Sequence, residues 1–271
     1  MTFWRFMDGS FDPSTALQGS YDPWLVLLSF LVASMAGYAA LNVAAHIITV
    51  ETRGARRAWL VAGALAMGTG IWAMHFIGMM AFSLPIYMSY DLIITLVSVL
   101  PAVLGSGLAL AIMSRPHIHQ RDLWGGAFLM AVGIGTMHYT GMEAMEMSAE
   151  LRYDPWPFAA SIVVAHFLAM LALSTKFMLS RSRYQDSFPV KVATAGLMGG
   201  AVTAMHYTGM TAAYFFPDPD ATLSSLPMDP SLMVTMIALI SIVVLGFTIY
   251  GVILDSWRRV GPVHTIRSGT F

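Results

Sequence analysis

The sequence predicts an all-α membrane protein with seven transmembrane helices, and three observations lead to this fold class. The chain of 271 residues is 57% hydrophobic and only 11% charged, whereas about a quarter of the residues in soluble domains are charged. Seven stretches contain the roughly 20 apolar residues that a helix needs to cross a bilayer. Basic residues gather in alternate connections between these stretches, which is typical of multi-pass membrane proteins.

A short polar connection separates each predicted helix from the next. Prolines fall at or near several predicted helix ends, and Pro101 predicts a kink inside the third helix. The predicted spans are Trp24–Ile48, Ala58–Phe82, Leu92–Met113, Leu123–Met147, Trp156–Leu179, Val190–Phe215 and Leu232–Leu254. The transmembrane domain thus covers 24–254, between a short N-terminal segment (1–23) without the apolar core of a secretory signal and a tail (255–271).

The distribution of charge predicts which ends of the helices face the cytoplasm. Of the 14 basic residues, 12 lie in one set of alternate connections, and only Arg5 and Arg152 lie in the other set. The positive-inside rule therefore predicts an extracytoplasmic N-terminus and a cytoplasmic C-terminal tail. We expect the lipid bilayer to surround the chain, and we expect no nucleic-acid partner.

The second, fourth and sixth predicted spans contain the same segment, Met-His-x-x-Gly-Met. Its histidines are His75, His138 and His206, which are separated by 63 and then 68 residues, or one helix pair each time. The sequence therefore predicts three pseudo-repeated helix pairs plus a final helix, related by an axis along the membrane normal. The three motif helices run in the same direction, so we expect their histidines to converge around this axis in the outer half of the bilayer.

The repeated segment places an imidazole and a thioether on one helix face, because residues four apart share a face. Imidazole suits several metals and thioether favours Cu(I), while the absence of cysteine excludes thiolate ligands and disulfides. We therefore expect copper, with haem as the alternative, and either one site of three histidines or several His/Met sites. A set of packing histidines kept by duplication is the competing interpretation, which the cost of polar residues in a bilayer disfavours. The candidate metal ligands are His75, Met79, His138, Met142, His206 and Met210.

Neighbouring residues have predicted supporting roles. The methionine before each histidine points about 100° away around the helix, which places it outside the first set of ligands, and the methionine eight residues before is expected roughly 12 Å deeper. The tyrosines and threonines of the motif are predicted to donate hydrogen bonds beside the site or to contact other helices. Glu143 either tunes one copy of the site or faces the outer headgroups, and His166 is either a packing residue or a ligand. These secondary candidates are Met74, Met137, Met205, Tyr139, Thr140, Tyr207, Thr208, Glu143 and His166.

The segments Met137-His138-Tyr139-Thr140 and Met205-His206-Tyr207-Thr208 resemble the signature of the MHYT domain family of bacterial membrane proteins. The first copy, Met74-His75-Phe76-Ile77, lacks both hydroxyls. The resemblance covers nearly the whole chain. It implies a protein of the bacterial cytoplasmic (inner) membrane that senses a diatomic gas, O₂, CO or NO, through bound copper, often beside cyclase or phosphodiesterase modules.

The residues after the last predicted span limit the expected function. Only 17 residues follow Leu254, which is too few for a catalytic domain. The sequence therefore predicts a stand-alone sensor that is not itself an enzyme and signals through a separate cytoplasmic or membrane partner. Copper storage, delivery or transport, and a haem or copper redox protein, are the alternative functions.

Overall fold

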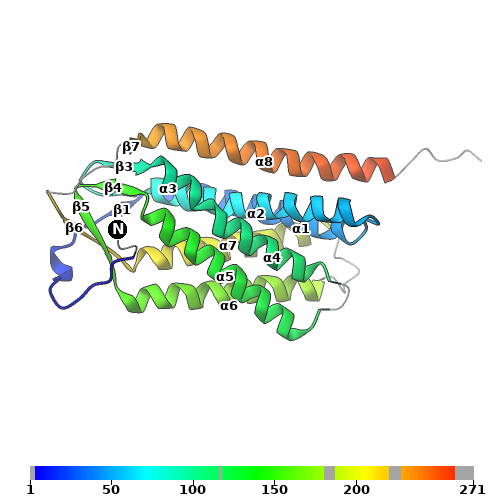
Figure 1. Cartoon of the computed structure of the whole chain (residues 1–271), viewed down its shortest axis with the longest axis horizontal. Helices are drawn as coiled ribbons and strands as arrows, with labels where there is room; N and C mark the ends of the chain where they lie inside the picture. The colour runs from blue at the N-terminus through cyan, green and yellow to red at the C-terminus, as the bar shows by residue number, and fades with distance from the viewer. Residues whose placement is uncertain (1–3, 116–117, 180–186, 220–226, 260–271) are drawn as a thin grey trace, which may run out of the picture.

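The computed structural model describes residues 4–115, 118–179, 187–219 and 227–259, which form a bundle of long helices with short strands at one end (Figure 1). The helices are α1 (Pro23–Ile47), α2 (Arg53–Ala81), α3 (Leu92–Val97), α4 (Val99–Met113), α5 (Gln120–Met142), α6 (Pro155–Leu179), α7 (Phe188–Met210) and α8 (Pro230–Arg259), and a 3₁₀ turn precedes them (Pro13–Thr15). The strands are β1 (Ser20–Tyr21), β2 (Phe82–Ser83), β3 (Met88–Asp91), β4 (Met145–Met147), β5 (Ala149–Tyr153), β6 (Ala213–Pro217) and β7 (Pro227–Met228).

Six helical segments pack into a closed ring. Going around it, α1 packs on α2, α2 on α4, α4 on α5, α5 on α6, α6 on α7, and α7 again on α1. The motif helices α2, α5 and α7 also touch one another across the middle of the ring. Helix α8 lies outside, along α2 and α1 (Figure 1). The predicted convergence of the motif helices is therefore confirmed, with the other helices of each pair placed between them.

Within the described ranges, six helices are long and apolar enough to cross a membrane. They are Pro23–Ile47, Arg53–Ala81, Leu92–Met113, Pro155–Thr175, Phe188–Met210 and Pro230–Leu254. The predicted fourth span corresponds to α5, whose 23 residues contain several glycines and the polar residues His138 and Thr140. These residues lower the mean hydropathy of α5, although it is as long as α7.

Two predicted spans end too late, because each includes residues that form a strand in the structure. The prediction of an all-α chain is therefore incomplete. Helix α5 ends at Met142 and α7 at Met210, not at Met147 and Phe215. The residues that follow each helix enter β4 and β6, whose backbone groups pair with β3 and β5. The residues after α7 stay apolar, and apolar character alone does not distinguish a helix from a short buried strand; after α5 the predicted span ran on past Glu143 and Glu146 to Met147. The fold is mostly helical, with a strand layer at one end.

Antiparallel strands close each of the three repeats. Strand β1 precedes α1 and pairs with β2, which follows α2. In the same way β3 pairs with β4 around the second repeat, and β5 pairs with β6 around the third. Strand β7 precedes α8 and adds to the free edge of β3. Each repeat is therefore a helix pair whose two ends are hydrogen-bonded to each other on the same side of the bundle.

The third predicted span is interrupted near Pro101, as expected. Its first part, α3, ends at Val97, and α4 begins at Val99. Proline has no N–H to bond the carbonyl of Val97, four residues earlier, so the helical ladder is weakened at this point. The indole Nε1 of Trp72 on α2 donates to the Thr95 carbonyl (2.9 Å) and lies 3.1 Å from Ser98 Oγ. This contact fixes the interruption against α2.

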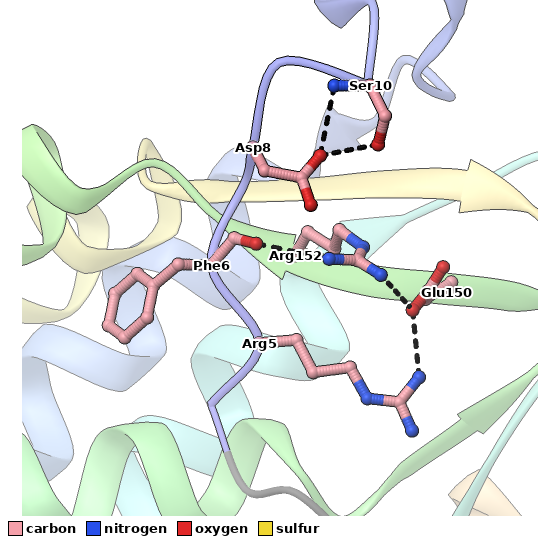
Figure 2. A network of polar contacts seen from close by, with 6 residues as sticks. All are labelled: Arg5, Phe6, Asp8, Ser10, Glu150 and Arg152. Atoms are coloured by element: carbon pink, nitrogen blue, oxygen red, sulfur yellow. Dashed lines mark hydrogen bonds and ion pairs between the residues drawn. The ribbon is translucent and has the colours of Figure 1, made fainter.

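The N-terminal segment lies across the strand layer. The Met7 N–H donates to the Tyr153 carbonyl and the Tyr153 N–H donates to the Arg5 carbonyl, at 2.9 and 2.8 Å. Figure 2 shows that the guanidinium groups of Arg5 and Arg152 both donate to Glu150 Oε1, at 2.8 and 2.9 Å. Burial alone would raise the pKa of the Glu150 carboxyl, but these two hydrogen bonds lower it below its ordinary value. Part of the predicted segment 1–23 is thus packed on the bundle, while only the start of the predicted tail 255–271, which continues α8 to Arg259, lies within the described residues.

Candidate metal centre

Three histidines from the three motif helices meet at the centre of the bundle. His75 on α2, His138 on α5 and His206 on α7 are each at most 1% exposed. Their Nδ1 atoms form a triangle with sides of 3.1 Å (His75–His206), 3.1 Å (His138–His75) and 3.2 Å (His206–His138). The rings are nearly perpendicular to one another, at 82–87°. We call these three residues the histidine triad; it is a group able to hold a metal ion.

Each ring of the triad packs on the glycine of another motif helix. A Cβ added to Gly141 on α5 would lie 2.4 Å from His75 Nε2. The same contact is 2.5 Å from Gly209 on α7 to His138 Nε2, and 2.5 Å from Gly78 on α2 to His206 Nε2. The contacts therefore run in a cycle from α2 to α5, from α5 to α7, and from α7 back to α2. Glycine is required at these positions because any side chain would occupy the space of a ring.

The triad has too few hydrogen-bond partners for its six ring nitrogens. A neutral imidazole has one ring proton, so each Nδ1 either donates or accepts. In a triangle of such atoms at least two must be of the same kind, and they repel each other. The three Nε2 atoms are buried and have no hydrogen-bond partner among the described residues. Because buried polar atoms without partners are costly, this cluster favours a bound cation that accepts all three Nδ1 lone pairs.

The size of the Nδ1 triangle fits a metal ion. A triangle with sides of 3.1–3.2 Å has its centre about 1.8 Å from each corner, close to the roughly 2.0–2.1 Å of an imidazole–metal bond. Ligating imidazoles usually donate their other ring N–H to an acceptor. Here the other nitrogens lie against glycine backbone, so ring orientation is fixed by packing.

The methionines of the motif are all buried around the triad. Met79, Met142 and Met210 are 0–5% exposed and lie one helical turn beyond the histidines on the same helix faces. Their role as metal ligands stays a prediction. The preceding methionines Met74, Met137 and Met205 are at most 1% exposed and belong to the same apolar core.

The aromatic residue after each histidine packs its ring on that histidine. In the two copies with tyrosine, the hydroxyl contacts another helix. The ring centroids are 4.8 Å apart for Phe76, 4.7 Å for Tyr139 and 4.7 Å for Tyr207. The Tyr139 hydroxyl lies 2.6 Å from Ser161 Oγ on α6, and the Tyr207 hydroxyl lies 3.4 Å from Ser29 Oγ on α1. The tyrosines therefore make interhelical contacts, and Phe76 replaces their ring contact in the first copy.

Neither threonine of the motif makes a hydrogen bond to a triad histidine. Thr140 is half-buried, and Thr208 Oγ1 donates to the Ala204 carbonyl on its own helix (2.7 Å). Such a bond to the preceding turn satisfies the hydroxyl within the helix.

Glu143 and His166 lie away from the three-histidine contacts. Glu143 follows α5 and is half-buried; its Oε1 accepts from the Trp4 N–H (3.3 Å), so the N-terminal segment covers it. Burial raises the pKa of Glu143, and burial together with the nearby Glu143 charge raises the pKa of Tyr153. His166 on α6 packs its ring on Trp124, with centroids 5.2 Å apart, which is the packing role considered for it.

Sequence reasoning missed one layer of the core. Ile71, Ile134 and Val202 precede the three histidines by four residues and are at most 4% exposed. One turn deeper, Met67, Met130 and Met198 line shared cavities. The motif helices thus present four successive layers with a spacing of four residues: methionine, β-branched residue, histidine and methionine. The same-face spacing that paired His with Met would also have identified this β-branched layer.

Comparisons with known proteins place the chain among bacterial signalling proteins. The MHYT family model, described as a bacterial signalling protein N-terminal repeat, matches residues 68–126 and 132–186, which contain the first two motif copies. The chain is 39% identical over 240 residues to the bifunctional diguanylate cyclase/cyclic di-GMP phosphodiesterase MucR of Pseudomonas aeruginosa, covering 89% of this chain and 35% of that protein.

Two further relatives match over a similar region. The cyclic di-GMP phosphodiesterase NbdA of Pseudomonas aeruginosa is 39% identical over 209 residues, covering 77% of this chain and 26% of that protein. The signalling protein YkoW of Bacillus subtilis is 32% identical over 222 residues, covering 80% and 28%. The chain therefore spans about a third or less of the length of these curated relatives. No solved structure matches it.

The repeated motif, the membrane helices and the relatives agree with one another. The matched region includes the parts of the motif helices α2 and α5 that carry His75 and His138. YkoW is a signalling protein by name, and MucR and NbdA are named as enzymes that make or degrade cyclic di-GMP. The chain belongs to the MHYT family of bacterial signalling proteins.

Proposed function

We propose that this chain is a membrane-embedded, copper-binding sensor of a diatomic gas, O₂, CO or NO, that signals through a separate partner. The observation that carries the proposal is the histidine triad, in which three buried Nδ1 atoms lie within 3.2 Å of one another and the three Nε2 atoms have no hydrogen-bond partner among the described residues. Such a cluster in an apolar core favours a bound cation. The family of bacterial signalling proteins to which the chain belongs supports the sensor role.

The donor atoms favour copper over other metals. The triad supplies three imidazoles, and the neighbouring layer supplies the thioethers of Met79, Met142 and Met210. The triad contains no carboxylate, and the chain contains no cysteine. Imidazole with thioether is a donor set that suits Cu(I), whereas Mg²⁺ and Ca²⁺ prefer oxygen. Bound Cu(I) would supply a soft Lewis acid with an open position for a diatomic ligand.

The protein's own residues hold and protect this centre. The rings of His75, His138 and His206 would hold the ion through Nδ1, and the glycine contacts of the neighbouring helices keep these rings in place. Ile71, Ile134 and Val202 exclude water from the inner side. Because each ring rests on a different motif helix, a change in the spacing of the Nδ1 atoms requires α2, α5 and α7 to shift relative to one another. This coupling is how ligand binding would reach the cytoplasmic ends of the helices.

The alternative functions use the same residues differently. Copper storage or delivery needs metal uptake but no response to a gas. A haem protein is disfavoured by geometry, because two axial ligands bind opposite faces of the macrocycle, whereas the triad nitrogens stand at hydrogen-bond distance from one another.

The relatives suggest the type of partner. MucR and NbdA are named as enzymes of cyclic di-GMP turnover, and this chain matches only part of each. We infer that the output of this bundle is received by a cytoplasmic enzyme of the same kind, which need not be part of this chain. Contact with the cytoplasmic ends of the helices would transmit the shift of α2, α5 and α7.

The topology that fits this function has seven spans with the strand layer outside. We infer that α5 crosses the bilayer as the seventh span, because it is 23 residues long and packs between the apolar helices α4 and α6. Basic residues such as Arg53 lie where the motif helices begin, opposite the strands, which favours an extracytoplasmic N-terminus in the cytoplasmic membrane of a bacterium.

Metal analysis of detergent-purified protein tests the proposal. Protein expressed with ample copper is expected to contain one copper per chain, and His75→Ala, His138→Ala and His206→Ala are each expected to lose it. His166→Ala is the matched control, because this histidine also lies in a membrane helix but packs on Trp124. Infrared spectra with CO then separate a sensor from a carrier that binds no gas.

The results that count against the proposal are distinct. If the wild-type protein contains no copper, or if the triad variants retain it, the proposed metal site is contradicted. Copper without any CO or NO response would leave the storage or delivery function in place of the sensor.

A further inference from the structure

Two adjoining cavities lie within the bundle on the inner side of the histidine triad. Their volumes are about 30 and 50 Å³. On the same measure a cavity needs roughly 10–15 Å³ to hold one water molecule, so each has room for a diatomic molecule. Both are lined by the three deep methionines of the motif helices and by two residues of α6, which are Met67, Met130, Met198, Ala172 and Leu173. We call the two cavities together the methionine chamber.

The lining of the methionine chamber cannot hold water well. Among its lining residues the only polar side chain is that of Ser106, whose Oγ donates to Met130 Sδ (3.8 Å). A buried water needs about two to four polar partners, and apolar cavities without them stay dry and bind small apolar guests. The chamber is therefore suited to an uncharged, weakly polar molecule.

The position of the chamber relates it to the triad. Its outer wall includes Ile134 and Val202, each one helical turn before a triad histidine. A single layer of β-branched side chains thus separates the chamber from the Nδ1 atoms. Helix α6 lies between the chamber and the lipid. Its residues Ala169 and Ala172 line the chamber, while Phe167 and Leu171 of the same helix are about half exposed. Lipid dissolves apolar gases, so the bilayer is the source that this arrangement fits.

We propose that the methionine chamber is a docking site for a neutral diatomic molecule, which passes from lipid into the chamber and past Ile134 and Val202 to the histidine triad. This rests on the proposed function in one respect, because the triad is the destination of the guest. Binding in the chamber itself needs no metal. The triad and the chamber are therefore separate sites that can be tested separately.

Xenon is the probe that tests the chamber, since it binds dry apolar cavities. Detergent-purified protein is titrated with xenon, and ¹²⁹Xe nuclear magnetic resonance separates saturable binding from partition into the micelle. Ala172→Leu fills a position shared by both cavities and is expected to weaken saturable binding at least tenfold. Ala160→Leu adds the same side chain to an exposed position of the same helix and is expected to leave binding unchanged.

Copper content is measured on the same samples, so that the two proposals can fail separately. If protein expressed with ample copper contains none but binds xenon saturably, the proposal of the chamber stands and the proposal of the metal site is contradicted. Normal copper with no saturable xenon binding, or with equal binding by wild type and Ala172→Leu, would overturn the chamber alone. If Ala172→Leu does not fold, Ala169→Leu, which fills the smaller cavity, must reduce binding.

With copper bound, the rate of CO association tests the route. Ala172→Leu is expected to slow CO association severalfold while copper content stays unchanged. An equal rate in wild type and variant would contradict passage through the chamber.

Discussion

At the scale of single residues, the glycine of each motif copy is as specific a requirement as the histidine. Gly78, Gly141 and Gly209 each receive the ring of a histidine from another helix. The sequence shows a glycine at the same position of each motif copy, but it does not indicate which side chain packs on that glycine. That information depends on the order of the helices around the axis, which no local pattern contains.

Gly141→Ala is expected to lower copper affinity by tenfold or more, which is within the roughly 10–100-fold range seen when support of a metal ligand is lost. The new Cβ would lie 2.4 Å from His75 Nε2 and would displace the ring. Gly196→Ala is the control, because nothing lies within 4 Å of that added Cβ. Copper titration of both variants measures the difference, and equal affinities would show that the glycine contact does not position the ring.

Glu143 gives the folded protein a dependence on pH. Burial raises the pKa of this carboxyl above its ordinary value of 4.5 in the folded state, so the folded state holds its proton at pH values where the unfolded state has lost it. The contribution of Glu143 to stability is therefore fully present below about pH 4.5 and is lost as pH rises through the folded-state pKa.

Glu143→Gln is expected to be more stable than wild type at neutral pH and to remove this slope, because its amide oxygen can still accept from the Trp4 N–H. Thermal unfolding in detergent between pH 4 and 8 measures both effects. Parallel curves for wild type and variant would exclude Glu143 as the source of the slope.

At the scale of elements, the sequence predicted the helices and missed the strands. The interruption at Pro101 could be predicted because proline removes a specific hydrogen bond. The strands that follow α5 and α7 could not, because Ala213–Pro217 continues the apolar character of α7, and the methionines of Met145–Met147 extended the predicted fourth span past Glu143 and Glu146. Their pairing partners lie far away in the sequence, and only the closed bundle brings them together.

Trp72→Phe is expected to destabilise the bundle by about 1–3 kcal/mol, because it removes a buried hydrogen bond and leaves a cavity where the larger indole ring packed, although the Ser98 hydroxyl still donates to the Thr95 carbonyl. The indole N–H otherwise donates to the Thr95 carbonyl where α3 ends. Trp156→Phe is the control, because Trp156 is 82% exposed. A lower melting temperature of Trp72→Phe alone is the expected measurement; a shift of equal size in both variants would contradict a specific role for this contact.

At the scale of the whole molecule, a bound ion would connect all three repeats. A ligand that binds only the folded state stabilises it by about 2.7 kcal/mol at a hundredfold excess over its dissociation constant. We therefore expect Cu(I) to raise the melting temperature of wild type and of His166→Ala, and to leave that of His138→Ala unchanged. An equal rise in all three proteins would point to binding elsewhere.

The internal repeat made most of this arrangement predictable. His75, His138 and His206 recur at matching depth on parallel helices, so their convergence followed from the repeat and the membrane. The choice between one three-histidine cluster and several His/Met pairs did not, because it depends on helix rotation. Helical periodicity places His75 and Met79 on one face but does not specify whether both reach the axis.

The cycle of histidine and glycine contacts also has a consequence for how many repeats the protein can have. Each repeat supplies one ring to the next and receives one from the previous, and the last contact returns to the first. If one repeat were removed from this arrangement, one histidine ring would lose the glycine on which it packs, and one glycine would lose its ring. Loss of a whole repeat would therefore open the cycle and remove one ligand even if every remaining motif were intact.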